Sequence, residues 1–461
     1  MAFSRATLDN SSECWSDWLK RSIGIRNSAT RRPQRGYRLY HWDEVVKHDK
    51  PGDCWIVIHG RIYDVTDWVE LHPGGKIIYE GAGSDCTEVW ESYHPLKVVD
   101  KGVSKKYLIG EIEGYENLYS WEGNFYKTVK QRVGEAVPKN LRREDPKIAF
   151  KGLFLSICYF ISLALYIYFC TWWSAIIYGV LCSQIGMISI EHKNDGVFTS
   201  LKTLTWLAGY TPDLASSRLV YKRSHEFQHG YNIHDQSNFS LLRLHINQRR
   251  FGIHRYQQVY AWLLYITIHF GDLFGTFNDF FWVSNSLNLR GSNSFSDFVF
   301  QIFVKFCWFL YTILIPCYLH GYLNIFPIWM LYMVSFGAGY ALFFAINHWV
   351  LEAGCVESIN NINWGVLKAE YSINFAIDSK FWTWITGGLN HQIEHNLFPA
   401  MVHTRLPEIA KIVQSTCKEF GVNYFSYPTF WDALKAHYRL LKALGNYDKP
   451  EILKKDSKLN T

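Results

Sequence analysis

The sequence has few charged residues. Asp, Glu, Lys and Arg together make up 19% of its 461 positions, and the formal net charge is only +6. So small an excess of basic residues over this length does not indicate a nucleic-acid partner, and we expect none. Aromatic residues are abundant instead, at 17%, which argues against both a disordered chain and a long coiled coil. The length predicts two or three domains.

Cysteine-pairing motifs and a signal peptide are also absent. The ten cysteines are scattered, and none forms a C-x-x-C pair. Several lie in apolar runs, so we expect reduced packing residues rather than disulfides or zinc ligands. The first twenty residues contain no apolar core of signal-peptide length, and we therefore expect the N-terminus to remain in the cytosol.

Charge is missing altogether from two long segments. Residues 152–190 and 306–351 contain no Asp, Glu, Lys or Arg. A single helix over 152–190 would be about 58 Å long, nearly twice the hydrocarbon thickness of about 30 Å. Each segment therefore predicts a hairpin of two membrane-spanning helices, which gives four spans.

The charges that flank these segments predict their orientation. The expected outer turns, at 170–174 and 321–327, contain no Lys or Arg, whereas the loop between the hairpins contains many basic residues. They are Lys202, Arg218, Lys222, Arg223, Arg243, Arg249, Arg250 and Arg255. Because basic residues mark the cytosolic side, an even number of spans places this loop and both termini in the cytosol. Residues 256–290, rich in aromatics, are expected at the membrane interface.

The segment before the first span differs in character. After a polar tail at 1–36, short strand-like runs separated by Gly and Asp predict a small α+β domain at 37–115. His72 lies in an HPGG turn, and His94 follows 22 residues later in WESYHP. Two imidazoles on opposite sides of a haem iron leave no open position, so such a site transfers single electrons. The runs YDVTDWVELHPGG and GSDCTEVWESYHP resemble cytochrome b5, which implies that His72 and His94 are the axial ligands of haem b.

The other conspicuous histidines lie near the ends of the expected spans. They are His192 after the second span, His225 and His229 in SHEFQHGYN, His348 at the end of the fourth span, and His391 and His395 in NHQIEHNLFP. Histidines four residues apart share one face of a helix, and imidazoles from several helices can enclose two metal ions. The alternative is that single histidines serve as polar tips in an aromatic-rich interface.

The order of these motifs resembles that of the cytochrome b5-fused front-end fatty acid desaturases, over about residues 37–445. The chain is also similar to insect cytochrome b5-related proteins. The resemblance implies an α+β cytochrome b5-like domain (37–115), a linker (116–150), an all-α membrane desaturase domain with about four transmembrane helices (151–445) and a C-terminal tail (446–461).

The same resemblance implies an oxidoreductase that uses O2 to introduce a double bond into a fatty-acyl lipid or acyl-CoA. Its electrons would come from the fused b5 domain, which NADH-cytochrome b5 reductase would reduce at the endoplasmic reticulum membrane. The implied ligands of non-haem iron are His192, His225, His229, His348, Gln392 and His395.

Each histidine box, however, lacks one histidine of the family pattern. The first has no second histidine after His192, Gly230 follows His229 in the second, and Asn396 follows His395 in the third. Asp195, His234 and His391 are candidate substitutes that would restore a di-iron site. Two functions therefore remain open at this point: a desaturase, or a catalytically inactive, membrane-anchored cytochrome b5 that serves in electron transfer or lipid binding.

Overall fold

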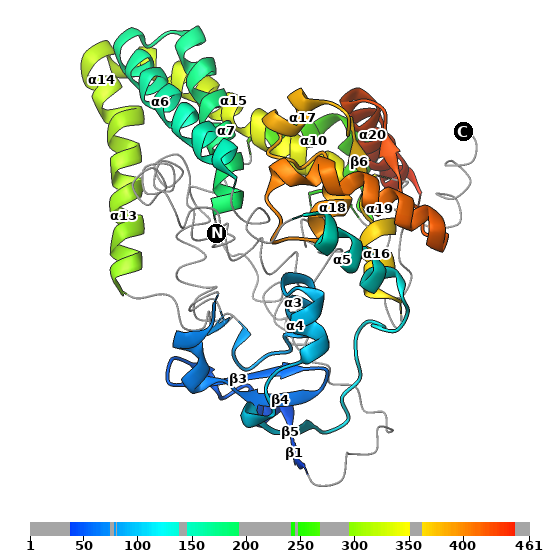
Figure 1. The fold of residues 1–461 in the computed structure, drawn as a ribbon. Coiled ribbons are helices and arrows are strands. Elements are labelled where there is room, and N and C mark those ends of the chain that lie inside the picture. The colour runs from blue at the N-terminus through cyan, green and yellow to red at the C-terminus, as the bar shows by residue number, and fades with distance from the viewer. Residues whose placement is uncertain are drawn as a thin grey trace. The chain divides into compact units, whose positions relative to one another are not determined.

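The computed structural model describes residues 37–73, 78–79, 81–137, 145–192, 241–244, 248–267, 295–350 and 362–447. They belong to two compact units. The first unit comprises Met1–Glu122 and two short later segments, and the second comprises most of the chain from Gly123 onward (Figure 1).

A five-stranded sheet forms the centre of the first unit, with the strand order β1-β5-β4-β3-β2. The strands are β1 (Arg38–Tyr40), β2 (Asp49–Lys50), β3 (Asp53–Ile58), β4 (Arg61–Asp64) and β5 (Leu108–Ile112). Strand β1 pairs in parallel with β5, and the other pairs are antiparallel. The turn between β3 and β4 is His59-Gly60, and both residues have positive φ, as the two-residue turn that matches strand twist requires.

Short helices cover this sheet and end at the two histidines of interest. The helices are α2 (Trp42–Val45), η1 (Thr66–Leu71), α3 (Thr87–Tyr93), α4 (Leu96–Lys101) and η3 (Lys105–Tyr107). Alternation along β3 directs Ile56 and Val57 into separate buried clusters. The cluster around Ile56 includes Val69 of η1 and is contacted by Trp90 of α3. His72 caps the C-terminus of η1, and His94 caps that of α3.

The second unit contains a bundle of long apolar helices. They are α6 (Pro146–Phe169), α7 (Trp172–His192), α13 (Phe295–Phe309), the π-helical turn η7 (Leu310–Leu314), α14 (Ile315–His320) and α15 (Tyr322–His348). Among the described residues, three stretches are long and apolar enough to cross a membrane: Pro146–Phe169, Ile302–His320 and Tyr322–Asn347. Helix α7 follows α6 after two residues and packs against both α6 and α15 (Figure 1). The predicted α+β domain followed by a helical membrane domain with about four spans is confirmed.

The helix boundaries differ from those expected from charge alone. Helix α6 begins at Pro146 rather than 152, because Asp145 caps it and the Lys151 ammonium donates to the carbonyl of Trp384. The turn expected at 321–327 is Gly321 alone, and Pro327 lies inside α15. A proline at this position has no N–H to donate to the carbonyl four residues earlier in the helix.

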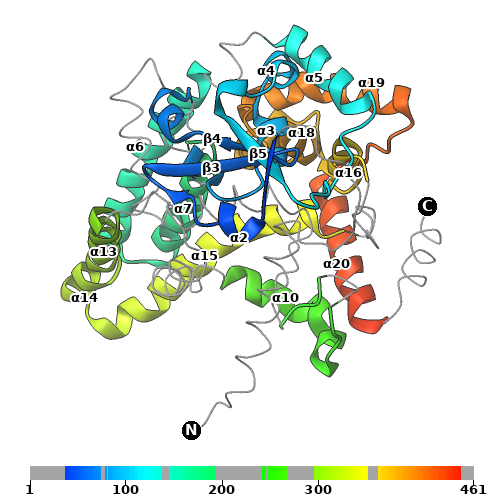
Figure 2. The same ribbon diagram turned by 90° about the horizontal axis from the view of Figure 1, so that it is seen from below.

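The remaining elements of the second unit surround the ends of α7 and α15. They are α5 (Phe125–Ala136), η5 (Gly252–Tyr256), α10 (Gln257–Ile266), α16 (Trp364–Glu370), β6 (Asn374–Phe375), α17 (Lys380–Ile385), α18 (Gln392–Leu397), η9 (His403–Arg405), α19 (Leu406–Phe420), β7 (Ser426–Tyr427) and α20 (Phe430–Asn446). Helices α10, α15 and α20 pack against one another (Figure 2). The short parallel pair β6–β7 is an addition to the helices that were expected.

Candidate functional site

The two histidines of the first unit face each other at the ends of η1 and α3. Their ring centroids are 6.1 Å apart, and the ring planes are inclined by 59°. The Nδ1 atom of His94 lies 3.1 Å from the Trp90 carbonyl oxygen. This contact fixes the proton on Nδ1 and leaves Nε2 for a metal, as is usual for histidine ligands.

This spacing suits a haem iron. Two imidazoles bound to one metal through bonds of about 2 Å have ring centres about 6 Å apart. The observed separation of His72 and His94 meets that requirement. The packing of the Trp90 ring against His94, at 4.4 Å between centroids, also limits how far that imidazole can turn. The residues present therefore fit a haem group.

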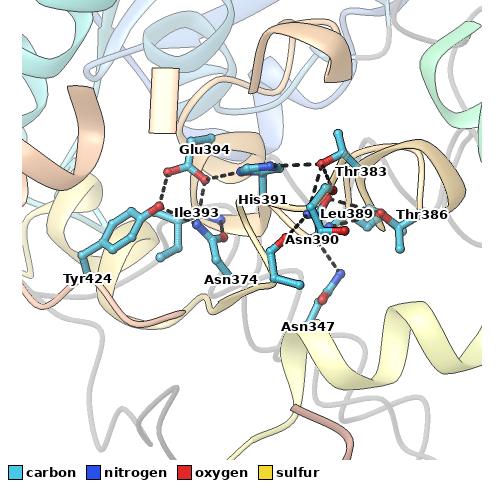
Figure 3. A network of polar contacts seen from close by, with 12 residues as sticks. Asn347, Asn374, Thr383, Thr386, Leu389, Asn390, His391, Ile393, Glu394 and Tyr424 are labelled. Carbon is cyan, nitrogen blue, oxygen red and sulfur yellow. Dashed lines mark hydrogen bonds and ion pairs between the residues drawn. The ribbon is translucent and has the colours of Figure 1, made fainter. Parts of the chain in front are cut away.

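The third histidine box lies in a buried polar network of the second unit (Figure 3). Glu394 accepts hydrogen bonds from the Tyr424 hydroxyl at 2.9 Å and from the Asn374 amide at 2.8 Å. The His391 Nδ1 atom lies 3.9 Å from the same carboxyl group, and its Nε2 atom lies 3.4 Å from the Thr383 hydroxyl. The network therefore holds the His391 ring between α17 and α18.

Burial sets the ionisation of this pair. It lowers the pKa of His391 to about 4, with a smaller contribution from His403. It raises the pKa of Glu394 to about 7, against the lowering effect of the hydrogen bonds from Asn374 and Tyr424. The His391 imidazole is therefore neutral at physiological pH, which is the form that can bind a metal.

A second set of buried amides connects α15 to this box. The Asn347 Nδ2 atom donates to the Leu389 carbonyl at 2.8 Å and lies 3.4 Å from the Gln392 Oε1 atom. Gln392 in turn donates to the Asn396 Oδ1 atom at 3.1 Å, and Asn396 donates to the Ser372 hydroxyl at 2.6 Å. We call Asn347, Gln392, Asn396 and Ser372 the amide ladder. Asn396, at the position of the missing histidine, therefore has a structural role.

The C-terminal parts of α7 and α15 lie close to the loop that precedes α18. Asn347 immediately precedes His348, so its contacts place the backbone of His348 beside Leu389 and Gln392. In α7, Met187 lies in the same buried cluster as Leu389, five residues before His192. The structure thus places Asn347, near the end of α15, and Met187, in the C-terminal part of α7, beside the loop that leads into the box with His395.

The described residues supply only part of an iron site. They contain no group of three or more His, Cys, Asp or Glu side chains arranged to hold a metal ion. His391, Gln392 and His395 are buried there, whereas Asp195, His225, His229 and His234 lie outside the described residues. So do the side chains of His192 and His348. The sequence did not single out Asn347, Asn374 or Tyr424. Glu394, the single acidic residue of NHQIEHNLFP, was an available signal for a polar network.

Together, the haem-compatible histidine pair of the first unit and the apolar helices of the second define a membrane protein with a fused haem-type domain. Residues 41–113 match the family described as "Cytochrome b5-like Heme/Steroid binding domain", and residues 171–428 match the family described as "Fatty acid desaturase". The second match covers more than half of the chain, and the chain belongs to the fatty acid desaturase family. The resemblance expected from the motifs is confirmed.

The chain aligns with its relatives over most of their length. It is 31% identical to the acyl-lipid (8-3)-desaturase of Physcomitrium patens, over 92% of this chain and 95% of that protein. It is 30% identical to the acyl-lipid (8-3)-desaturase of Mortierella alpina, over 90% and 99% of the two chains. Among solved structures, cytochrome b5 of Ostreococcus tauri virus 2 is 35% identical and matches 16% of this chain and 94% of its own, with a TM-score of 0.15. The first domain implies a haem, and the second implies a membrane protein of a family that uses di-iron.

Proposed function

We propose that this protein is a front-end fatty-acyl desaturase whose own cytochrome b5 domain supplies the electrons. In this reaction one O2, two electrons and two protons are consumed, two C–H bonds of adjacent acyl carbons are broken, and two water molecules form. The observation that carries the proposal is the convergence of the ends of α7 and α15 on the third histidine box, in a chain that matches both families. We propose an acyl chain of a membrane lipid as the substrate, since relatives are named acyl-lipid desaturases.

The residues have separate tasks in this proposal. His72 and His94 hold haem b, which accepts and passes on one electron at a time. His192, His225, His229, His348, Gln392 and His395 are the proposed iron ligands, with Asp195, His234 or His391 replacing the missing histidines. Two bound irons would supply the oxidising chemistry. The amide ladder positions Gln392 against α15, and the buried aromatic bundle keeps water away from the acyl chain.

The location and partners follow from the same proposal. We infer an endoplasmic reticulum protein with both termini in the cytosol, where NADH-cytochrome b5 reductase can reduce the haem. The proposed haem domain spans 37–115, and the proposed membrane domain, expected over 151–445, includes the whole of α6 from Pro146.

One observation favours a second candidate, a membrane-anchored cytochrome b5 that transfers electrons without desaturating lipid. Asn396 stands where the family has an iron ligand, and both ends of its amide are hydrogen-bonded within the amide ladder. A carboxamide held in this way does not replace an imidazole. Three histidines are missing in all, and losses even of groups that merely support a ligand weaken metal sites about 10–100-fold.

Expression in a desaturase-poor yeast distinguishes the two candidates. The wild-type chain should contain two non-haem irons and produce a new unsaturated acyl product, and His395→Ala should lose both. His320→Ala is the matched control, because His320 ends α14 and lies on the side of the bundle away from the box; this variant should retain both.

A haem variant completes the comparison. His72→Ala should abolish the six-coordinate low-spin spectrum and the product, while leaving the non-haem iron content unchanged. One iron or none in the wild-type chain, with an unaltered lipid profile over a wide set of supplied acyl chains and an intact haem spectrum, would instead establish the electron carrier.

A further inference from the structure

Helix α10 has apolar residues on the face that packs against the protein and also on the opposite, exposed face. Ala261 and Tyr265 are buried against α15 and α20, in a cluster that includes Ala341, Ala345 and Leu441. On the opposite face, Val259 and Leu263 are 66% and 60% exposed, and Tyr256, the last residue of η5 directly before α10, is 62% exposed. These three positions share one face at helical spacing. A helix that is apolar all round requires an apolar environment on its outer side.

The charges at the start of this segment are all of one sign. Residues 241–267 contain four arginines and no Asp or Glu. Arg243 is buried and donates to the carbonyls of Leu444 and Tyr447, and Arg250 donates to that of Gly445. Arg249, Arg250 and Arg255 are all exposed. An exposed apolar face that begins at exposed arginines is complementary to the acyl chains and phosphates of a lipid surface.

Packing against α15 sets the depth of this helix. The 27 residues of α15 extend about 40 Å, whereas about twenty residues cross the hydrocarbon core. If α15 enters the core at Tyr322, it leaves it near Ala341. The backbone at Ile266, the end of α10, contacts α15 at Gly337, where a side chain would meet the Ile266 carbonyl. Helix α10 thus lies alongside the part of α15 that passes from hydrocarbon to headgroups.

We propose that residues 249–267, the interface segment, lie in the lipid leaflet at the C-terminal end of α15. Tyr256, Val259 and Leu263 contact acyl chains, and Arg249 and Arg255 contact lipid phosphates. The segment therefore anchors the loop between the two helical hairpins to the membrane and prefers anionic lipid. The proposal depends on the membrane location of the chain and not on its catalytic activity.

Photocrosslinking in yeast membranes tests the contact with acyl chains. The photoreactive residue p-benzoylphenylalanine is introduced at Val259 or at Leu263, and at Lys435 as the control, an exposed position on the polar side of α20. Lipid adducts at 259 and 263 should exceed those at 435 by at least tenfold. A crosslink between two copies, to another protein or to residues 268–294, in place of lipid adducts would overturn the proposal.

The arginines are tested in nanodiscs of phosphatidylcholine with 30% phosphatidylserine. Each arginine at a membrane surface contributes about a fivefold preference for anionic lipid. Arg249→Gln with Arg255→Gln should therefore reduce the enrichment of phosphatidylserine among the adducts at 259, bringing the ratio of phosphatidylserine to phosphatidylcholine adducts close to that of the bulk lipid. The double variant Lys411→Gln with Lys435→Gln is the matched control and should leave the enrichment of phosphatidylserine at 259 unchanged. An unaltered enrichment in the arginine variant, with the same thermal midpoint as wild type, would contradict the role of the arginines.

Discussion

Histidines in this protein differ in chemistry because their surroundings differ. His72 and His94 face each other across a gap that suits an iron, whereas His437 is entirely enclosed by protein. The His437 Nδ1 atom lies 2.6 Å from the Trp349 carbonyl oxygen, and its Nε2 atom lies 2.9 Å from the Tyr265 hydroxyl. This neutral tautomer connects α20 and α10 to the residue that follows His348.

The enclosure of His437 gives the folded state a specific pH dependence. Burial lowers the pKa of His437 to about 4, from 6.5 in an unfolded chain, against the raising effect of the bond to Trp349. Between these values the unfolded state binds more protons than the folded state, so stability falls as the pH is lowered from 6.5 to 4. Because one proton is involved, the unfolding free energy is lower at pH 4 than at neutral pH by about 3 kcal/mol. His437→Gln, which can keep both hydrogen bonds, should lack this component.

The measurement is denaturant unfolding in detergent at several pH values. The difference in unfolding free energy between wild type and His437→Gln should shrink on acidification by about 3 kcal/mol. His391 and the carboxyl groups titrate in both proteins and cancel in the difference. Parallel pH profiles for the two proteins would show that His437 is not neutral and enclosed as described.

Among the helices, a glycine allows α7 and α15 to pack in close contact. A Cβ atom at Gly179 of α7 would lie 2.6 Å from the Tyr332 carbonyl oxygen and 2.7 Å from the Ser335 Cβ atom of α15. Small residues at such crossings let membrane helices approach closely. Because the obstacle is partly backbone, a side chain at this position must push the two helices apart.

Gly179→Leu should therefore lower the unfolding free energy by about 1–3 kcal/mol, the usual range for overpacking. Gly252→Leu is the matched control, since nothing lies within 4 Å of a Cβ atom there. The thermal midpoint of the purified protein should fall for the first variant and stay near that of wild type for the second. Equal midpoints for the two variants would contradict the close α7–α15 crossing.

The sequence predicts elements better than it predicts the contacts between them. Uncharged runs located the helical hairpins because the membrane excludes charge over a fixed length. They missed the first six residues of α6, since the Lys151 ammonium is accommodated by the Trp384 carbonyl and lies over the Trp384 ring. Similarly, the HPGG and WESYHP motifs predicted a pairing of His72 and His94, and the two rings lie close together in the structure.

The third box shows why the remaining contacts could not be predicted. Glu394 is satisfied by Asn374 and Tyr424, which lie 20 and 30 residues away in the chain. Asn396 is bonded to Ser372, 24 residues away. No local pattern encodes such pairs; they arise when β6 and α18 pack together. The replacement of a histidine by Asn396 could therefore be read from the motif, but its hydrogen bonds could not.

For the whole molecule, the number of membrane crossings determines whether electrons can pass from the haem domain to the histidine boxes as proposed. The first unit precedes α6, and the third box follows α15. Four crossings, by α6, α7, α13–α14 and α15, return the chain to the side on which it started. An odd number would put the haem of His72 and His94 across the bilayer from His395, and single-electron transfer between them would be blocked by a hydrocarbon layer of about 30 Å.

Tags at the two termini should therefore both be digested when protease is added to sealed microsomes. A glycosylation acceptor inserted at Gly321, the turn between α14 and α15, should be modified by the lumenal enzyme. One crossing, by α15, separates that turn from the box, and residues 321–327 contain no Lys or Arg. The same acceptor placed after Tyr447 is the control and should remain unmodified. Protection of one terminus alone would require an odd number of crossings. The haem domain would then lie on the opposite side of the membrane from the histidine boxes, and it would have to donate its electrons to a partner on its own side.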